Sequence, residues 1–542
     1  MSIRRITALI LIVMLVFTAS ACHKRKKADG PVDLSSRAKA LEAEKPVKVT
    51  QPTELYVKIA GNLYKTSDDI ALGGFVDYGT KLSILGYDRA DTAGNVHMWH
   101  VTDGTTDGWI RNRYVAATQE EAKRPEVEYE EQVVGTVSDT DSTPKTELVA
   151  KDYPIGSIEY YYSFHETRPD KYGGGDAASL DYYPREAFTP LKESPEVCKT
   201  LYIPGNSKAT AKYRQFLEVA GSSDINAFVV DITDNTCVGF PAETMEKMCP
   251  SAAAAASNTK EYYAEVIKAL KDSGYYVIGR ITTFNDGYLC QDHPEWGIVD
   301  QNGKLKAISK TYWPSAYNRN VWEYKVRLAM EAAQTYGFDE IQFDYVRFPD
   351  RTQTMEANGE LDFRNEYGET KAQAITRFLQ YATDCLHDIG VSVSADVFGE
   401  TANAYVAPHG QYWPAISNTV DYISAMPYCD HYAADGDWYP WEHPYDILTT
   451  FGTAAYKRQQ EVPTPARVRT WIQCYDSIRA PKVIYDAEHV SQEINALYDA
   501  GLCGGFITWN ANADTEKYMG LRPAFDIDPD EKQMRKYDLL YR

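Results

Sequence analysis

The sequence predicts an α/β protein in which a (β/α)8 barrel follows a small all-β domain. Eight short apolar runs alternate with amphipathic helical segments over roughly 375 residues, the element count of such a barrel with insertions. An open doubly wound sheet would carry a glycine-rich phosphate turn after its first strand, and neither GxGxxG nor GxxxxGKS/T occurs. Ahead of the barrel, residues 51–117 alternate short β-rich runs with glycine- and aspartate-rich turns.

Composition narrows the class of protein and its partners. Hydrophobic residues make up 44% of the 542 residues and charged residues 25%, which excludes a mainly disordered or fibrous chain. The net charge of −21 repels phosphate backbones, so we expect no nucleic-acid partner. The 41 Tyr and 10 Trp suit a ligand that stacks on aromatic rings.

The N-terminus has the order of a secretory signal. Two arginines precede an apolar run at 6–17, which is too short to span about 30 Å of hydrocarbon, and small residues then lead to Cys22. This order resembles a bacterial lipobox and predicts removal of 1–21 and a lipid on Cys22; ordinary cleavage near Ala21 is the alternative. The protein would be exported and held at the membrane by this lipid. The eight later cysteines permit disulfides, but several lie in apolar runs where free cysteine packs as a small hydrophobe.

Residues 22–50 are rich in Lys, Ala and Glu and predict a lipid-attached tether. The all-β segment 51–117 ends in MWHVT at 98–102 and GWIRNRYV at 108–115. These strings resemble bacterial SH3 domains, which often end in a Gly-Trp-Val/Ile…Tyr-Val/Leu strand. The resemblance implies contact with peptidoglycan or another envelope component, and a structural spacer is the alternative.

The next segment changes composition again. Residues 118–150 carry nine acidic residues against three basic ones, mixed with Ser, Thr and Pro, and predict a solvated linker. The α/β pattern occupies 151–525, and residues 526–542 follow as a C-terminal tail.

The barrel elements follow from periodicity. Trp322, Val326 and Ala333 share one helical face, and glycines such as Gly337 and Gly390 stand just after predicted helices, where helices commonly end. The predicted strands are 197–203, 225–232, 275–283, 338–346, 391–398, 420–426, 468–475 and 504–510.

Carboxylates terminate four of the eight predicted strands. Asp231 ends the second strand, Asp344 the fourth, Asp396 the fifth and Asp476 the seventh, and Glu400 follows shortly after the fifth. Active sites of (β/α)8 barrels lie at the C-terminal ends of the strands. These acids are therefore the first candidates for chemistry.

The alternation of side chains along a strand predicts the direction in which these acidic side chains point. Side chains alternate with period two, so Gln342 and Asp344 share a polar face that should point into the barrel, and Asp396 does the same on the next strand. Two close carboxylates push their pKa values apart, which gives one acid and one base or nucleophile. A structural salt bridge from Asp344 to Arg280 or Arg347 is the alternative.

Aromatic residues gather at the same predicted rim. Tyr428 ends the sixth strand, Trp509 lies in the eighth, and the loop 428–445 adds Trp438 and Trp441. Aromatic side chains on a rim stack on sugar faces, although some of these would simply hold a long loop in place. The histidines of this loop match no standard metal spacing, so we expect neither a metal nor another cofactor.

The string GFDEIQFDYVRFP at 337–349 resembles the hallmark of a bacterial family of glycoside hydrolases with a TIM-barrel domain. Four further strings fit the same family in the same order: 226–232, 276–281, 393–399 and 426–428. The resemblance implies a glycosidase-like barrel. Carried over by position, it implies a site formed by Asp231, Arg280, Asp344, Arg347 and Asp396.

The sequence thus predicts an envelope-anchored glycoside hydrolase that cleaves a polysaccharide or a cell-envelope glycan. Asp344 would be the nucleophile or base, Asp396 the acid with Glu400 as its substitute, and Asp231 would position the sugar. The alternatives are a non-catalytic glycan-binding lipoprotein with a degenerate barrel and a structural envelope protein. The residues expected to bind substrate are Arg280, Arg347, Gln342, Tyr428, Trp438, Trp441, Asp476 and Trp509.

Overall fold

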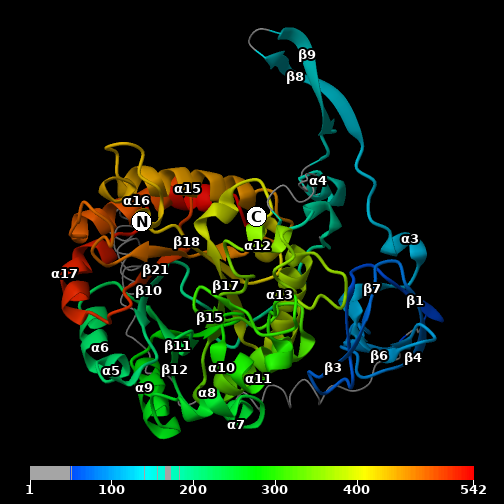
Figure 1. Ribbon diagram of the computed structural model, residues 1–542, viewed down its shortest axis with the longest axis horizontal. Coiled ribbons are helices and arrows are strands. Elements are labelled where there is room, and N and C mark those ends of the chain that lie inside the picture. Colours follow the sequence, from blue (N-terminus) through cyan, green and yellow to red (C-terminus); the bar gives the residue numbers. More distant parts are fainter. Residues whose placement is uncertain are drawn as a thin grey trace, which may run out of the picture.

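A computed structural model describes residues 49, 52–138, 141–154, 157–164, 173–181 and 183–541. The chain forms a barrel, a smaller all-β domain against its side, and a hairpin that projects away from both (Figure 1). The predicted signal at 1–21 and Cys22 lie outside the described residues. No helix in the described part of the chain has the length and apolar character needed to cross a membrane.

The N-terminal domain is a seven-stranded antiparallel sheet with the order β3-β2-β6-β5-β4-β1-β7. Its core contains Val57, Leu82, Val101 and Ile110, all fully buried. The predicted all-β character of 51–117 is therefore observed, while its likeness to SH3 domains stays a prediction. The strands are β1 (Glu54–Val57), β2 (Gly61–Tyr64), β3 (Leu72–Val76), β4 (Lys81–Tyr87), β5 (Met98–Thr102), β6 (Asp107–Arg111) and β7 (Val115–Ala116).

The predicted linker is solvent-exposed but not irregular. After α3 (Gln119–Ala122), the strands β8 (Tyr129–Ser138) and β9 (Asp141–Ala150) pair as an antiparallel hairpin that extends from the molecule (Figure 1). Charge density suggested a linker, whereas β-branched residues at intervals along both strands, among them Val133 and Thr146, favour extended pairing.

All eight predicted barrel strands are present and parallel. Their order is β19-β18-β17-β16-β13-β11-β10-β21-β20. The seventh predicted strand is divided at Arg469: β19 pairs with β18 and β20 pairs with β21, so the nearly closed ring is completed through this residue. The strands are β10 (Cys198–Ile203), β11 (Ala227–Asp234), β13 (Tyr276–Thr282), β16 (Glu340–Asp344), β17 (Ser392–Phe398), β18 (Tyr422–Met426), β19 (Arg467–Val468), β20 (Thr470–Gln473) and β21 (Gly505–Trp509).

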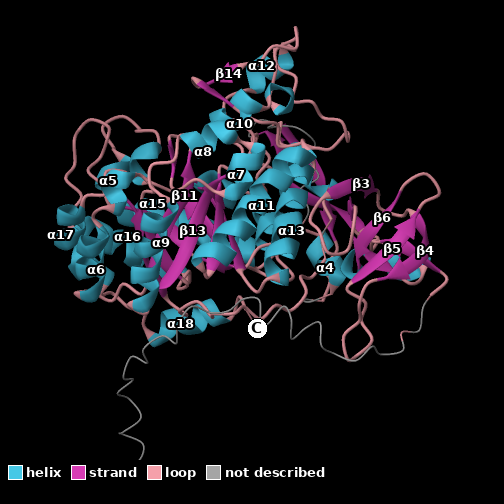
Figure 2. Cartoon of the chain, turned by 90° about the horizontal axis from the view of Figure 1, so that it is seen from below, coloured by secondary structure: helices cyan, strands magenta, loops and turns pink. Residues whose placement is uncertain are grey.

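Helices surround the strands (Figure 2). The predicted apolar face is buried, as at Trp322 and Val326, and Gly337 (φ 73°) and Gly390 (φ 76°) take the left-handed conformation expected after a helix. The longer helices are α6 (Tyr213–Gly221), α9 (Lys260–Asp272), α11 (Arg319–Tyr336), α13 (Lys371–Asp388), α15 (Pro444–Gln459), α16 (Ala487–Ala500) and α17 (Thr515–Phe525). Shorter elements are α4 (Ile158–Tyr162), α5 (Ser207–Thr210), α7 (Glu243–Met248), α8 (Pro250–Ala254), α10 (Gly287–Asp292), α12 (Gln353–Ala357), α14 (Trp413–Ser417), β12 (Cys237–Val238), β14 (Ala307–Ile308) and β15 (Thr311–Tyr312).

The C-terminal segment is not a free tail, which corrects the expectation for 526–542. It contains α18 (Glu531–Asp538), whose first turn is closed by a reciprocal capping box between Asp530 and Gln533. Tyr537 in the last turn of this helix and Leu540 just after it are both buried against the barrel. These two apolar residues lie in a highly charged segment, so the sequence pattern gives little indication that the segment packs on the barrel.

The all-β domain is fixed to α13 by polar and apolar contacts. Arg111 at the end of β6 pairs with Asp388 (Nη2 to Oδ2, 2.9 Å). The Tyr114 hydroxyl donates to Asp384 Oδ2 (2.7 Å), and the rings of Tyr64 and Tyr381 lie 5.8 Å apart. The two parts therefore share a packed boundary rather than a flexible connection.

The eight cysteines of the described chain are all free thiols. Seven are buried, and Cys237 is partly exposed. Of the two possibilities left open by the sequence, packing as small hydrophobic side chains is the one observed.

Candidate active site

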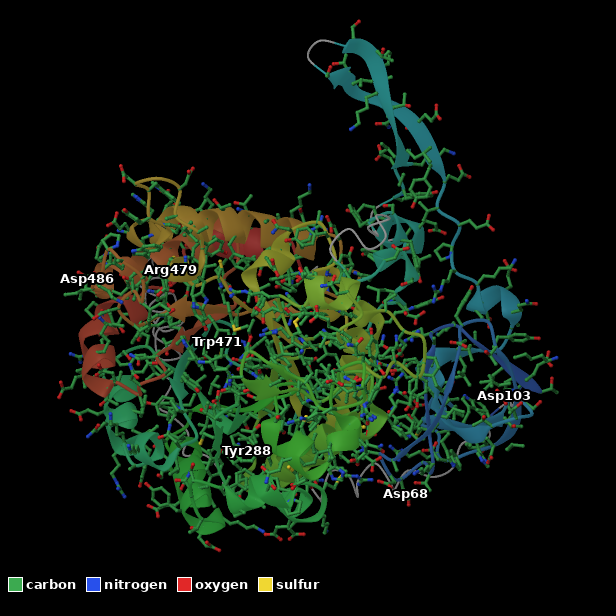
Figure 3. The ribbon with its side chains drawn as sticks, viewed as in Figure 1. Asp68, Asp103, Tyr288, Trp471, Arg479 and Asp486 are labelled. Carbon is green, nitrogen blue, oxygen red and sulfur yellow. The ribbon has the colours of Figure 1, made fainter. Side chains whose placement is uncertain are left out.

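A pocket of about 520 Å³ opens at the C-terminal ends of the barrel strands. Asp231 near the end of β11, Asp344 at the end of β16 and Trp509 at the end of β21 all line it. This is the edge at which barrel active sites are built, as the sequence predicts. Trp471 lies in the interior of the barrel, whereas Asp486 lies at its outer side (Figure 3).

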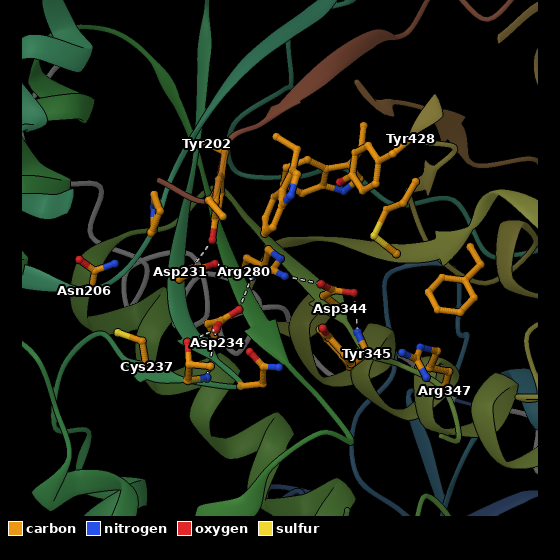
Figure 4. A pocket seen from close by; sticks show the side chains of 18 of the residues that line it. Tyr202, Asn206, Asp231, Asp234, Cys237, Arg280, Asp344, Tyr345, Arg347 and Tyr428 are labelled. Atoms are coloured by element: carbon orange, nitrogen blue, oxygen red, sulfur yellow. Dashed lines mark hydrogen bonds and ion pairs between the residues drawn. The ribbon is translucent and has the colours of Figure 1, made fainter. Parts of the chain in front are cut away.

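Arg280 on β13 is the centre of the pocket floor, with only 2% of its surface exposed. Its Nη1 donates to Asp231 Oδ1 (2.6 Å), and its Nη2 donates to Asp344 Oδ2 (Figure 4). Asp396 Oδ2 lies 3.6 Å from Nε, and Asp234 Oδ2 lies 3.7 Å from Nη1. One cation thus stands among four carboxylates, because β11, β13, β16 and β17 are successive neighbours in the ring.

Asp231 is held by three kinds of donor. Besides Arg280, the Tyr202 hydroxyl donates to its Oδ2 (2.6 Å), and the Gly205 amide lies 3.4 Å from the same oxygen. A Cβ at Gly205 would meet the Asp231 carbonyl oxygen at 2.5 Å, so only glycine fits there. Burial raises the pKa of Asp231 to about 6, despite the opposing charge of Arg280. This carboxyl can therefore hold or release a proton in weakly acidic solution.

Asp344 is oriented by the turn that follows its strand. The Tyr345 amide donates to Asp344 Oδ1 (2.6 Å). Tyr345 has a φ of 48°, a left-handed conformation that is uncommon for a bulky residue and that tends to occur at functional sites. Both oxygens of this pocket-lining carboxylate are therefore fixed.

Asp396 is deeper than the sequence predicts. Its surface is fully buried and it does not line the pocket, because Arg280 and Trp471, which do line it, lie between. Trp471 Nε1 donates to Asp396 Oδ1 (2.8 Å). Burial, reinforced by the charge of Asp344, raises the pKa of Asp396 well above its usual value. A carboxyl at this depth orients its neighbours and does not reach a sugar in the pocket.

Three other polar candidates do not line the pocket. Gln342 points into the barrel as predicted, but its amide reaches Ser424 (3.3 Å) below the pocket. Glu400 pairs with His409 (3.0 Å), a hydrogen bond that lowers the pKa of Glu400 and makes it a poor acid. Asp476 accepts from Lys517 at the surface. Alternation along a strand predicts which face of the sheet a side chain lies on. It does not predict how deep in the barrel that side chain lies, or where the loop after the strand places its residues.

The aromatic candidates divide in the same way. Tyr428 and Trp509 line the pocket with rings 6.3 Å apart and 28° from parallel, which gives a surface for stacking. Trp441 is buried and donates to the Pro481 carbonyl (2.8 Å), so it holds its loop. Trp438 stacks on the neighbouring His443 (5.0 Å) and does not line the pocket.

Asp234, which was not predicted from the sequence, lines the pocket and accepts from the Thr236 amide and hydroxyl. A register shift between Asp231 and Thr233 breaks the simple alternation of β11. The sequence shows an aspartate three residues after Asp231, but it does not show the bulge that turns the Asp234 side chain toward the pocket. In the described part of the chain, no group of three His, Cys, Asp or Glu residues is arranged to hold a metal ion.

No curated protein matches the sequence. A hypothetical protein from Ruminiclostridium thermocellum ATCC 27405 is 32% identical, with 36% of this chain and 97% of that chain covered and a TM-score of 0.31. The PgaB (BpsB) glycoside hydrolase domain from Bordetella bronchiseptica is 12% identical, with 60% and 99% covered and a TM-score of 0.41. A Flavobacterium johnsoniae chitobiase is 12% identical, with 66% and 51% covered and a TM-score of 0.41.

A family described as "Putative glycosyl hydrolase domain" matches residues 200–515, which is more than half of the chain and includes every strand of the barrel after the first residues of β10. With this match, the chain belongs to that family of glycosyl hydrolase domains.

Proposed function

We propose that the protein is a glycoside hydrolase of the cell envelope that cleaves a polysaccharide or an envelope glycan. The observation that carries this proposal is the pair Asp231 and Asp344, which flank one guanidinium on the floor of an open pocket. Glycosidic cleavage needs two carboxyl groups in different roles, and the pocket supplies two in different surroundings. The family match supports the same class of reaction.

The roles follow from the surroundings of each acid. Asp231, with a pKa of about 6 due to burial, is the general acid that protonates the leaving oxygen. Asp344, ion-paired with Arg280 and fixed by the Tyr345 amide, is the nucleophile or base. The sugar stacks on Trp509 and Tyr428. This assignment moves the acid from Asp396 to Asp231, because Asp231 lines the pocket.

Digestion of a library of α- and β-linked glycans tests the proposal. Asp231→Asn and Asp344→Asn should each lower kcat/KM by about 100-fold or more on any glycan that the unmodified protein cleaves. The matched control is Asp476→Asn, a strand-end acid outside the pocket, which should retain activity. Since Arg280 would lose a buried partner, melting temperatures must accompany the rates. Unchanged activity in folded Asp344→Asn would refute the assignment.

One observation favours the alternative of a non-catalytic glycan-binding protein. All four side-chain oxygens of Asp231 and Asp344 already have hydrogen-bond partners within the chain. A site whose acids are fully engaged can bind a sugar without turning it over. In the library experiment, a glycan that binds but is not cleaved by the unmodified protein, with binding unaffected by Asp344→Asn, would establish this alternative.

The cellular setting is also a proposal and rests on the sequence. We propose export, a lipid on Cys22 that holds the protein at the membrane, and contact of the all-β domain with peptidoglycan. Cys22→Ala should abolish incorporation of labelled palmitate and release the protein from the membrane fraction. The full-length protein should sediment with insoluble peptidoglycan. Membrane retention of the Cys22→Ala variant would contradict lipid anchoring.

A further inference from the structure

Arg347 lies at one side of the pocket and is the second cation in its wall. It stands beyond Asp344 and Tyr345, on the side opposite Asn206 and Asp234 (Figure 4). Three aromatic rings surround its guanidinium: Phe398 at 4.5 Å, and Tyr345 and Trp313 each at 5.1 Å. The pocket thus has an acidic side and a cationic side.

The hydrogen bonds of Arg347 leave part of its donor fork unused. Nη1 donates to the Phe348 carbonyl (3.0 Å) and more distantly to Asp350 (3.4 Å), a carboxylate that is itself partly exposed. Among the described residues, neither Nε nor Nη2 of Arg347 has a hydrogen-bond partner. A guanidinium stays charged in proteins, so this is a nearly buried cation with free donors at the pocket wall.

Another arginine shows what a purely structural cage looks like in this chain. Arg319 is stacked between Trp322 (3.9 Å) and Tyr367 (4.0 Å), and it is as deeply buried as Arg347. Unlike Arg347, it binds Glu369 through both Nη atoms (2.8 and 2.6 Å). The aromatic cage at Arg347 therefore lacks the bidentate carboxylate that completes the cage at Arg319.

We propose that the missing carboxylate belongs to the substrate, and that Arg347 selects a glycan bearing an acidic sugar. The inference rests on the proposed function of the same pocket. A guanidinium fork matches a carboxylate, and the surrounding rings exclude water, which strengthens the pair. Asp234, which lines the opposite side of the pocket, disfavours a negative group there, so the acidic sugar lies at the Arg347 side. Because a net charge of −21 repels polyanions at long range, isolated carboxylates suit the site better than a carboxylate on every sugar.

The test uses the unmodified protein and three pairs of oligosaccharides. The probes are peptide-free peptidoglycan strands, which carry a carboxylate on each muramic acid, and oligosaccharides containing glucuronate or galacturonate. Each is compared with its carboxyl-reduced twin by calorimetry at 0.15 M salt. At least one charged probe should bind about 10- to 100-fold more tightly than its twin, the range of a charge-assisted hydrogen bond. If no charged probe binds better than its twin, the inference is overturned.

Two substitutions test whether Arg347 causes the preference for the charged probe. Arg347→Met keeps an unbranched side chain between the rings but removes the charge, and should bind the charged probe as weakly as its reduced twin. The matched control is Arg351→Met, in the same loop with a side chain 93% exposed, which should behave like the unmodified protein. Persistent preference for the charged probe in folded Arg347→Met overturns the inference; if that variant does not fold, the comparison of twins decides.

Cleavage separates this inference from the proposed function. Equal cleavage of charged and reduced probes would support the proposed hydrolase activity and refute the proposed carboxylate-binding role of Arg347. Binding that depends on both the carboxylate and Arg347, without cleavage of any probe, would support the carboxylate-binding site and refute the proposed hydrolase activity.

Discussion

Arg280 determines the charge balance on which the proposed chemistry depends. It pairs with Asp231 and Asp344 directly and lies near Asp234 and Asp396, so a single positive charge faces up to four negative ones. Such an excess cannot be held fully ionised at low exposure. Burial accordingly raises the pKa values of Asp231 and Asp396, and Asp231 is the raised one that lines the pocket.

The raised pKa of Asp231 predicts a pH profile. An acid with a pKa of about 6 in the folded protein is protonated below that pH and loses its proton above it. The kcat/KM should therefore fall as pH rises through about 6, with a slope of one proton. Asp231→Asn should have low activity without this limb. An unchanged basic limb in Asp231→Asn would show that another group is the acid.

The same shift has a consequence for stability. Between the pKa of an unfolded aspartate, about 3.9, and about 6, the native state retains a proton that the unfolded state has lost. The contribution of Asp231 to the free energy of unfolding therefore decreases as pH rises through this window.

Their positions at the ends of predicted strands were sufficient to bring Asp231, Asp344 and Asp396 together from the sequence, and period-two alternation added the face of Asp344 and Asp396. It could not rank them by depth, because depth depends on the tilt of each strand and on what covers it. Arg280 and Trp471 cover Asp396, and neither contact leaves a local signal in the sequence.

At the scale of elements, the boundary between the all-β domain and α13 is the feature that the sequence conceals most fully. Asp384 and Asp388 of α13 lie one turn apart in the sequence and resemble an ordinary solvated face. In the structure, Asp384 is 5% exposed and faces Arg113 Nη2 (2.8 Å), and Tyr114 donates to it. A charged helical surface gives no indication of a partner distant in sequence.

This boundary predicts a large stability effect at Asp384. Asp384→Ala would leave Arg113 and Arg111 near the boundary without that charge and the Tyr114 hydroxyl without its acceptor. We expect a loss of about 3–5 kcal/mol in the free energy of unfolding. The control is Asp107→Asn, whose side chain is 70% exposed and which should change stability by less than about 1 kcal/mol. Equal effects of the two substitutions in urea titrations would contradict the role given to Asp384.

For the whole molecule, eight apolar runs and the turn-rich N-terminal pattern were enough to predict a barrel and an all-β domain. These patterns did not indicate that the two parts pack together, yet Tyr64 and Met98 of the all-β domain belong to the same apolar core as the barrel. Two charge-rich segments form secondary structure that the sequence pattern did not predict, namely the hairpin of β8 and β9 and the helix α18. Composition describes the average character of a segment, whereas a few well-spaced residues determine whether it folds.

The shared core predicts that the two parts unfold together. Opening either part would expose Tyr64 and Tyr381 and separate the charges of Arg111 and Asp388. In hydrogen exchange measured by mass spectrometry across a urea series, peptides from β5 and α13 should report opening free energies within about 1 kcal/mol of each other. Peptides from β8 and β9 serve as the internal reference: a two-stranded hairpin with exposed side chains should exchange first. Loss of protection in β5 at urea concentrations that leave α13 protected would mean that the boundary is a contact between independently stable domains.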